Sequence, residues 1–396
     1  MRYVFVILDG AGDRGSPTPF EAAKKPNMDF LAKHGKVGLV DVGYKKSVNS
    51  DFGYLSLLGC YDEHDYPGRG YIEALGVGLT PGENDVCIRC NFATLDARGN
   101  VKDRRAGREE SGLDMFCENI DGMEIDGVRF SVRKSAGHRA VLVLSGRDLS
   151  DQIYPNDPMK TGVPLMQVKP KSPEGKKTAN ILNKFITRIT NMLAREPFNK
   201  KRKYKASTMM IRSVGHVIKT KTFNDRFGLN AVCIAGIPVA FGVARFLGMD
   251  TIHVAGANGM PDTNLKGKTD AVLRVLKDKK KKHDFIFLHI NGTDILAHDR
   301  KREQKKKLIE KIDSELGRIM KAVDLKKTVF VVTCDHRTVS LPKSEFPHYE
   351  HVTDPVPAVV SGGKTKPDKS GAFGESVCSR GFRFKAKDFL PSILGK

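Results

Sequence analysis

Three short apolar runs, far apart in the sequence, each lead into side chains that can bind a metal ion. The runs cover residues 4–8, 285–290 and 329–332, and the polar residues that follow them are Asp9, Asp294, His298, Asp335 and His336. Runs this short and this rich in β-branched residues predict strands that are buried on both faces, as in a parallel sheet. Open α/β sheets bind their ligands at the carboxyl ends of the strands. We therefore expect these polar side chains to meet at one edge of one sheet.

Each of these signals also has an ordinary structural explanation. Asp9-Gly10 is a common turn sequence, and Asp335-His336 is also what a simple hydrogen-bonded pair looks like. The spacing of Asp294 and His298 places two side chains on one face of a helix, but such pairs also arise by chance. Because all of them follow predicted strands, we favour a common site. Carboxylates together with imidazoles indicate divalent metals and phosphate chemistry.

The length of the chain and the pattern of its predicted strands and helices indicate two domains. At 396 residues the chain is too long for one ordinary domain. Strands and helices alternate over residues 1–85 and again over residues 206–396, whereas residues 86–205 show strand-like alternation with loops rich in Gly, Asp and Arg. We expect the outer segments to form an α/β core with a mostly parallel central sheet and helices on both faces. The middle segment, with a helix over residues 178–193, is expected to be an inserted, smaller α+β domain.

The hydropathy and the cysteines indicate an intracellular protein. No apolar run approaches the ~18 residues of a membrane span. The first apolar stretch runs into Asp9-Gly10 without the cleavage site of a signal peptide. Seven scattered cysteines fit reduced thiols better than a disulfide framework. Cys87-x-x-Cys90 lies in a predicted strand without a second pair of ligands, which favours a structural role. We expect a cytoplasmic protein that does not bind membranes.

The net charge of +21 raises the question of a nucleic-acid partner. Three segments rich in Lys and Arg cover residues 200–203, 277–282 and 300–307, and each borders a predicted helix or loop. The helix after the third segment has an apolar face that includes Leu308, Ile312, Leu316 and Ile319. This spacing puts the lysines on the solvent side. The sequence has no RNA-binding motif or zinc finger, so we do not expect a nucleic-acid partner. A positive field also suits a small phosphorylated or carboxylate substrate.

Two further features indicate phosphate chemistry. Ser50 precedes the apolar stretch from Phe52 to Leu58, where it is a plausible helix N-cap. A serine at a helix N-terminus is also well placed to carry a phosphoryl group, because free N–H groups there stabilise anions. The segment from Asp103 to Arg108 contains three guanidinium groups, a type of group that binds carboxylate and phosphate in bidentate fashion.

Several motifs match one known family along nearly the whole chain. They are Leu8-Asp9-Gly10, Ser50-Asp51, Gly68-Arg69-Gly70, Asp103 to Arg108, Gly137-His138-Arg139, Thr293-Asp294 with His298-Asp299, Asp335-His336, and His351 before Asp354-Pro355-Val356-Pro357. With them the chain resembles the archaeal-type, cofactor-independent (2,3-bisphosphoglycerate-independent) phosphoglycerate mutases of the alkaline phosphatase superfamily. The resemblance implies an alkaline-phosphatase-like core, and interconversion of 3-phosphoglycerate and 2-phosphoglycerate in glycolysis and gluconeogenesis.

The resemblance also implies the site residues. Two divalent metal ions are expected, manganese or zinc with magnesium or cobalt as alternatives, and no 2,3-bisphosphoglycerate. One metal would be bound by Asp9, Ser50, Asp335 and His336, and the other by Asp294, His298 and His351, with His348 as the alternative to His351. Ser50 would carry the phosphoryl group as a phosphoserine. The substrate would be held by Arg69, Arg104, Arg105, Arg108, His138 and Arg139.

The chain departs from the family pattern around these residues. After Ser50-Asp51 it has Phe52-Gly53-Tyr54 in place of Thr-Ala-His, and after Asp335-His336 it has Arg337-Thr338-Val339 in place of Ser-Thr-Pro. Arg337 is expected beside the metals, where its charge would bind an extra anion or compete with a metal. One alternative function is another phosphotransferase or hydrolase of the superfamily, a phosphatase or phosphonate hydrolase with the same Ser50 and metals. The other is a non-catalytic basic protein on a decayed enzyme scaffold.

Overall fold

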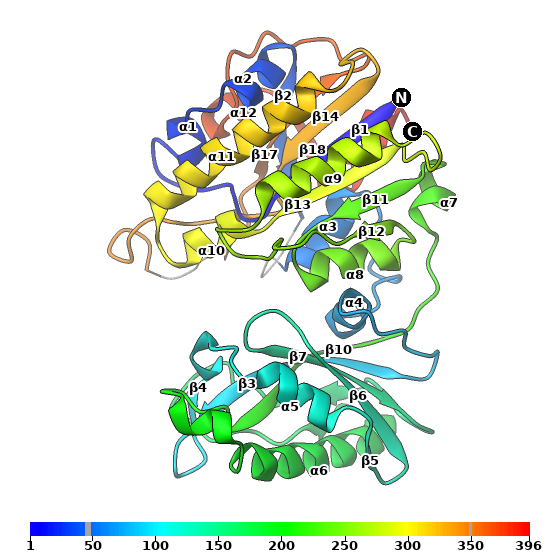
Figure 1. Ribbon diagram of the computed structural model, residues 1–396, viewed down its shortest axis with the longest axis vertical. Coiled ribbons are helices and arrows are strands. Elements are labelled where there is room, and N and C mark those ends of the chain that lie inside the picture. Colours follow the sequence, from blue (N-terminus) through cyan, green and yellow to red (C-terminus); the bar gives the residue numbers. More distant parts are fainter. Residues whose placement is uncertain (44–48, 348–350) are drawn as a thin grey trace. The chain divides into compact units, whose positions relative to one another are not determined.

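The computed structural model describes residues 1–43, 49–347 and 351–396, and the chain divides into two compact units. The first unit combines residues 1–63 with residues 221–396, and the second unit comprises residues 64–220 (Figure 1). Two segments that are far apart in the sequence therefore build the first unit. Each unit contains a sheet and a buried apolar core of its own.

An eight-stranded sheet forms the centre of the first unit, with the strand order β12-β11-β13-β1-β14-β17-β2-β18. In chain order these strands are β1 (Arg2–Leu8), β2 (Gly35–Asp41), β11 (Ala231–Ile234), β12 (Asp250–Ile252), β13 (Phe285–Ile290), β14 (Thr328–Thr333), β17 (Val356–Gly362) and β18 (Phe382–Lys385). Neighbouring strands are parallel except at β17, which is antiparallel to β14 and to β2. The mostly parallel α/β core predicted from the sequence is confirmed.

Helices surround this sheet. They are α1 (Pro19–Ala22), α2 (Pro26–Lys33), α3 (Ser50–Leu57), α7 (Phe223–Phe227), α8 (Pro238–Phe246), α9 (Leu265–Lys277), α10 (Gly292–His298), α11 (Arg302–Lys321), α12 (Glu375–Cys378) and α13 (Ala386–Leu394). Helix α11 packs against α2 and α9, and α3 packs against α8 and α13; Figure 1 shows α9 and α11 in front of the sheet. Every residue of β13 and β14 is buried, which explains why these strands appear in the sequence as continuous apolar runs.

The second unit is built on an antiparallel sheet with the order β10-β3-β7-β6-β5, to which β4 is added beside β3. Its strands are β3 (Val86–Leu95), β4 (Val101–Asp103), β5 (Met123–Ile125), β6 (Val128–Lys134), β7 (Arg139–Ser145) and β10 (Thr208–His216), with β8 (Ile153–Tyr154) and β9 (Lys169–Pro170) as a separate pair. Its helices are α4 (Arg69–Gly76), α5 (Leu113–Ile120) and α6 (Lys176–Leu193), with 3-10 turns at Ala106–Arg108, Pro173–Gly175 and Pro197–Lys201. One face of the sheet packs on α5 and α6, and the other face packs on α4.

The two faces of this sheet separate the cysteines of the Cys-x-x-Cys motif. Cys90 belongs to the core beneath α5 and α6, whereas Cys87 packs on the α4 side with Val141. Both thiols are free and buried. Because they point in opposite directions, they cannot bind one metal ion together, and they fill the two cores instead.

The borders of the second unit differ from the predicted ones. The sequence predicts an inserted domain over residues 86–205, whereas the unit comprises residues 64–220. Residues 64–85 contribute α4, which packs on β3 and β10, and residues 206–220 contribute β10, which pairs with β3 along most of its length. The sequence places both segments in the α/β core because short apolar elements look alike in either domain. Their partners are decided only by tertiary contacts.

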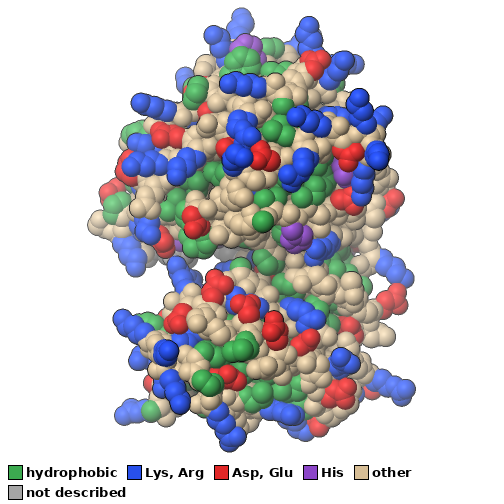
Figure 2. Space-filling model, viewed as in Figure 1, with side chains coloured by type: hydrophobic (Ala, Val, Ile, Leu, Met, Phe, Trp, Pro, Cys, Tyr) green, Lys and Arg blue, Asp and Glu red, His purple; other side chains and the backbone are tan. Residues whose placement is uncertain are grey.

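Basic side chains are distributed widely over the surface. Figure 2 shows Lys and Arg scattered over the visible face of both units, with Asp and Glu among them. Several are paired within one helix or between neighbouring helices, as Arg318 is with Glu315 and Asp270. Such a mixed surface is typical of solvated helix faces. In the part of the chain that the structure describes, no helix combines the length and the apolar character needed to cross a membrane.

Candidate active site

The side chains predicted to meet at the sheet edge follow three adjacent strands. β13 and β14 lie on either side of β1, and all three run parallel, so their carboxyl ends share one edge. Asp9 follows β1, Asp294 and His298 lie on α10 after β13, and Asp335 and His336 follow β14. The structure therefore brings all five into one part of the first unit.

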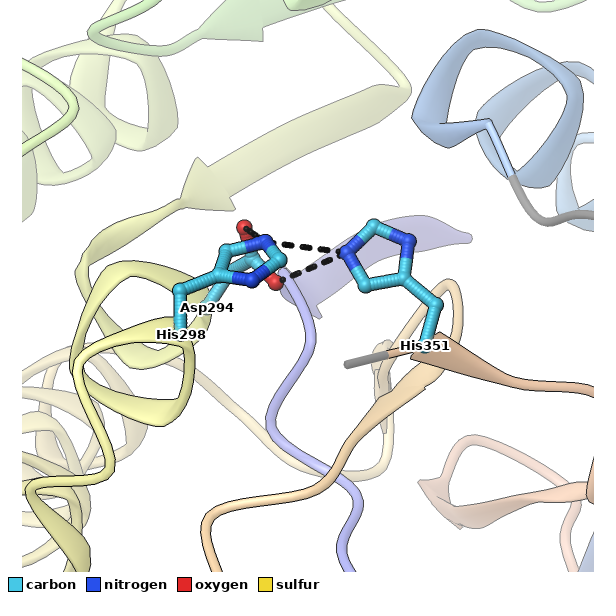
Figure 3. Close-up of side chains that lie close together, drawn as sticks. All are labelled: Asp294, His298 and His351. Atoms are coloured by element: carbon cyan, nitrogen blue, oxygen red, sulfur yellow. Dashed lines mark hydrogen bonds and ion pairs between the residues drawn. The ribbon is translucent and has the colours of Figure 1, made fainter. Parts of the chain in front are cut away.

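Asp294, His298 and His351 form one group of candidate ligands (Figure 3). His351 begins β16 (His351–Val352), a short strand that pairs with β15 (Arg337–Thr338). His298 Nε2 lies 3.2 Å from Asp294 Oδ2, and His351 Nε2 lies 3.5 Å from Asp294 Oδ1. The two Nε2 atoms are 3.0 Å apart. Two imidazoles and a carboxylate that converge in this way suit zinc or manganese. His348, the alternative to His351, lies outside the described residues.

A second group joins the buried side chains of Asp9, Asp335 and His336. His336 Nε2 lies 3.5 Å from Asp9 Oδ1 and 3.4 Å from Asp335 Oδ2. Among the described residues, none of these three atoms has a hydrogen-bond partner. Buried polar atoms normally have a hydrogen-bond partner. Two carboxylate oxygens and one imidazole nitrogen that face one another without such partners fit the ligands of a bound cation. Asp294 also lies close to Asp9 and His336, so the two groups adjoin.

Thr338 and Gly10 fix the position of the Asp294 carboxylate. The Thr338 oxygen lies 2.7 Å from Asp294 Oδ1 and 3.0 Å from His336 Nδ1, so it links the two groups. Gly10 has a φ of +60°, and a Cβ there would lie only 2.5 Å from Asp294 Oδ1. The turn after β1 therefore requires glycine both for its backbone conformation and for its close approach to Asp294.

A buried tyrosine and a buried histidine hold the other oxygen of Asp9. The Tyr54 hydroxyl donates to Asp9 Oδ2, and His289 Nε2 lies 2.7 Å from the Tyr54 oxygen and 3.1 Å from Asp9 Oδ2. Ser50, the first residue of α3, makes a side-chain hydrogen bond with the same Tyr54 hydroxyl. Ser50 is thus connected to the Asp9 carboxylate through one intervening side chain.

The neighbouring charges shift the pKa values of this cluster. Burial, followed by the charge of Asp9, raises the pKa of Asp335 well above its usual value. Burial alone would raise the pKa of Asp294, but His298 and His351 hold it well below its usual value. Burial, followed by the charge of His351, lowers the pKa of His336 to about 4. The His336 ring is therefore neutral near physiological pH, which is the form that binds metals.

Ser50 occupies a helix position that differs from the predicted one. Asn49 is the N-cap of α3, and Ser50 is its first helical residue. The N-cap prediction is therefore wrong by one position, because a sequence pattern locates a helix end only to within one or two residues. The Ser50 hydroxyl still lies at the N-terminus of an eight-residue helix, where free N–H groups favour an anion.

The predicted substrate residues lie in the second unit, and two of them are held by carboxylates. Arg69 begins α4, and its Nε and terminal nitrogen lie 3.1 and 3.0 Å from Glu73 Oε1, one turn further along the helix. Arg104 binds both oxygens of the buried Asp157, at 2.9 and 2.7 Å. These contacts fix the direction of each guanidinium group and neutralise part of its charge.

The remaining predicted substrate residues surround a buried histidine. Burial of His138, followed by the charges of Arg139 and Arg105 and then of Arg89 and Arg108, lowers its pKa to about 2. Arg105 and Arg108 are exposed on the 3-10 turn after β4. The His138 ring is therefore neutral, and the neighbouring charges that lower its pKa are those of guanidinium groups.

Arg337 makes two hydrogen bonds to backbone carbonyl oxygens. Its Nε donates to the carbonyl oxygen of Pro355 at 2.7 Å, and a terminal nitrogen donates to the carbonyl oxygen of Asp13 at 3.2 Å. These bonds tie β15 to the loop after β1 and to the segment before β17. These contacts favour a structural role for Arg337, and the expectation that its charge binds an extra anion or competes with a metal stays a prediction.

Comparisons with known proteins identify the family. The family model described as 2,3-bisphosphoglycerate-independent phosphoglycerate mutase matches residues 32–199. A 2,3-bisphosphoglycerate-independent phosphoglycerate mutase of Methanocaldococcus jannaschii is 38% identical over 391 residues, which cover 96% of this chain and 92% of that relative. This chain belongs to that family.

Solved structures agree with this assignment. A protein from Pyrococcus horikoshii is 30% identical with a TM-score of 0.81, and the match covers 100% of this chain and 96% of that one. The cofactor-independent phosphoglycerate mutase from Thermoplasma acidophilum is 30% identical with a TM-score of 0.66, over 99% of this chain and 98% of that one. The predicted family is confirmed, and the chain is an enzyme of the isomerase class to which these mutases belong.

Several residues of this family member's candidate site are not found by the sequence analysis. His289 interrupts an apolar run, and Tyr54 lies one helical turn after Ser50. Both residues could therefore have been identified as candidates from the sequence. Arg89 could have been identified too, because it is a charged residue inside an alternating strand. Thr338 could not, because only the folded chain brings its hydroxyl between Asp294 and His336.

Proposed function

We propose that this mutase-family protein interconverts 3-phosphoglycerate and 2-phosphoglycerate, with a phosphoserine on Ser50 as the intermediate. The observation that carries the proposal is the convergence of the unsatisfied atoms of Asp9, Asp335 and His336, together with the link from Ser50 through Tyr54 to Asp9. The similarity over nearly the full length of a relative with this name supports the choice of substrate.

The donor atoms of the site suit two divalent metal ions. Asp9, Asp335, His336 and Ser50 would hold one ion, and Asp294, His298 and His351 would hold the other. Mixed carboxylate and imidazole donors favour manganese or zinc over calcium. Such ions, when bound, lower the pKa of a hydroxyl nucleophile and stabilise phosphoryl oxygens.

The residues around Ser50 position it for phosphoryl transfer. Tyr54 and His289 hold Asp9 from one side, which directs the second oxygen of Asp9 toward His336. The free N–H groups of the first turn of α3 favour the negative charge that a phosphoryl group on Ser50 would carry. The Ser50 oxygen would take the phosphoryl group as the phosphorus–oxygen bond to glycerate breaks. The other glycerate oxygen would take it back.

The second unit would be the inserted, substrate-binding domain. A mutase must retain glycerate between the two transfers, because released glycerate leaves water as the acceptor and turns the reaction into hydrolysis. The guanidinium groups of Arg69, Arg104, Arg105, Arg108 and Arg139 would supply charge for binding a carboxylate. The neutral ring of His138 is close enough to Arg105, Arg108 and Arg139 for their charges to lower its pKa.

The proposal is tested with Ser50→Ala and with Ser56→Ala, a matched control in the same helix. We expect the wild type and Ser56→Ala to convert 3-phosphoglycerate to 2-phosphoglycerate when manganese is returned after chelation, and Ser50→Ala to be inactive. Peptide mass spectrometry during turnover should find phosphate on Ser50. Glycerate as the main product would support a phosphatase instead, and turnover by Ser50→Ala would exclude the phosphoserine.

A further inference from the structure

One face of the sheet in the second unit carries arginines beside α4. Arg89 on β3 lies two residues after Cys87, and Arg139 on β7 lies two residues before Val141; both Cys87 and Val141 pack on the α4 side. Side chains two residues apart in a strand share a face. Arg89 and Arg139 therefore point to the α4 side, away from the core beneath α5 and α6. Asn91 shares this face and is paired directly with Arg139.

An irregularity in β10 adds another arginine near this face. The register between β10 and β3 shifts at Arg212, next to the position opposite Arg89. A bulge of this kind redirects the side chain of the extra residue. The charge of Arg212 acts on Arg89, so the two guanidinium groups are near one another. Arg212 also donates to Asp157, the carboxylate that Arg104 binds through both oxygens.

Glu73, like Asp157, is shared by two guanidinium groups. Arg89 Nε lies 3.5 Å from Glu73 Oε1, an oxygen that already accepts two hydrogen bonds from Arg69. Arg89 Nε is buried and, among the described residues, makes no hydrogen bond. Burial, followed by the charges of Arg139 and Arg69, lowers the pKa of Arg89 to about 9. A buried cation that is only partly compensated indicates that an anion belongs beside it.

Asn91 contributes an acceptor that needs a donor. Its side chain is buried, and its Nδ2 donates to the carbonyl oxygen of Arg104 at 3.3 Å. Its Oδ1 has no hydrogen-bond partner among the residues that the structure describes. Positions 89 and 91 share a face of the sheet, and their Cα atoms are about 7 Å apart along the strand, so one small ligand can contact both side chains. An anion that satisfies both residues therefore carries a carboxylate and, a few bonds away, a hydroxyl.

We propose that Arg89, Arg212 and Asn91 form a subsite for a hydroxy-carboxylate anion. The two guanidinium groups bind the carboxylate, and Asn91 Oδ1 accepts a hydrogen bond from the hydroxyl. Glu73 and Asp157 orient the guanidinium groups without neutralising them fully. The inference rests on the proposed function to the extent that glycerate is the hydroxy-carboxylate retained between the two transfers.

The test measures anion binding by the full-length chain after chelation, so that phosphate chemistry at the first unit does not contribute. The probes are D-glycerate, propionate, which lacks both hydroxyl groups, and inorganic phosphate, each titrated by calorimetry. The variants are Arg89→Met, Arg212→Met and Asn91→Leu. Arg188→Met, at an exposed position of α6, is the matched control.

We expect Arg89→Met and Arg212→Met each to weaken glycerate binding at least about tenfold, the usual effect of losing a charge-assisted hydrogen bond. Asn91→Leu should reduce the preference for glycerate over propionate, and Arg188→Met should resemble the wild type. Unchanged glycerate binding in both arginine variants would overturn the inference. So would an effect on phosphate alone, or a wild-type chain that does not bind glycerate.

Thermal unfolding and the mutase assay separate this inference from its alternatives. Removing a partly compensated buried cation should leave the melting temperature of ligand-free Arg89→Met equal to or above that of the wild type. A clear fall would assign Arg89 to bracing Glu73 and overturn the inference. A chain that binds glycerate through Arg89 but has no mutase activity would support the subsite and refute the proposed function. Mutase activity with an unchanged KM in both arginine variants would refute only the subsite.

Discussion

Tyr54 donates a hydrogen bond from its phenolic hydroxyl to Asp9 Oδ2, which leaves Asp9 Oδ1 facing His336 Nε2 at 3.5 Å. The contact joins the helix that begins with Ser50 to the end of β1. Burial, followed by the charge of Asp9, raises the pKa of Tyr54 well above its usual value. The phenol therefore keeps its proton and remains a donor.

Tyr54→Phe is expected to weaken metal binding without unfolding the protein. The variant removes the donor that orients Asp9, and the loss of such a partner typically costs 10–100-fold in metal affinity. Calorimetric titration of the chelated protein with manganese measures the change. Tyr3→Phe, at the other end of β1, is the control. Equal manganese affinity in Tyr54→Phe and the wild type would show that Asp9 is positioned without the phenol.

Gly10→Ala is expected to damage the same site from the backbone side. A Cβ at this position would lie 2.5 Å from Asp294 Oδ1 and 2.6 Å from Thr338 Oγ1, and the φ of +60° adds about 1 kcal/mol or more of strain. We expect both a lower melting temperature and weaker metal binding. Gly228→Ala tests strain alone, since Gly228 has a φ of +63° and nothing within 4 Å of its added Cβ. If both variants bind metal equally well, Asp294 tolerates the displacement.

Arg337→Met is expected to affect stability rather than chemistry. The variant leaves the carbonyl oxygens of Pro355 and Asp13 without their donors, which should lower the free energy of unfolding by about 1–3 kcal/mol. The KM for 3-phosphoglycerate and the manganese affinity should stay within about twofold of wild type. Denaturant unfolding and steady-state kinetics measure the two effects. A markedly lower KM or tighter metal binding would support the view that this arginine competes at the site.

The burial of His138 predicts a pH dependence of stability. Burial and the neighbouring arginines lower its folded-state pKa from 6.5 to about 2. Between these values the unfolded chain binds a proton that the folded chain does not. Stability is therefore complete above the unfolded pKa and falls as the pH is lowered toward the folded pKa.

His138→Gln should remove this loss. Between about pH 6.5 and pH 5, the wild type should lose about 1.5 kcal/mol more stability than the variant. Urea unfolding at both pH values gives the difference directly. The same loss in both proteins would mean that His138 becomes protonated within the folded unit.

The sequence by itself was sufficient to predict the central strands of the core sheet and most of the candidate metal-binding side chains that follow them. Residues 4–8, 285–290 and 329–332 are recognisable because strands buried on both faces must be apolar throughout. The polar residues that end them are confined to the sheet edge by the parallel arrangement. Local pattern therefore carried enough information to bring Asp9, Asp294 and Asp335 together.

Only the tertiary structure decided which groups surround these side chains. Tyr54 and Thr338 acquire their roles through Asp9 and Asp294, which lie far away from them in the sequence, and no local pattern identifies such partners. The same reason explains the borders of the second unit, because α4 and β10 belong to it through their packing on β3. Arg337 shows the limit most clearly: its charge suggested a role at the site, and its hydrogen bonds to Pro355 and Asp13 favour a structural one. The direction of a long side chain depends on acceptors that only folding brings within reach.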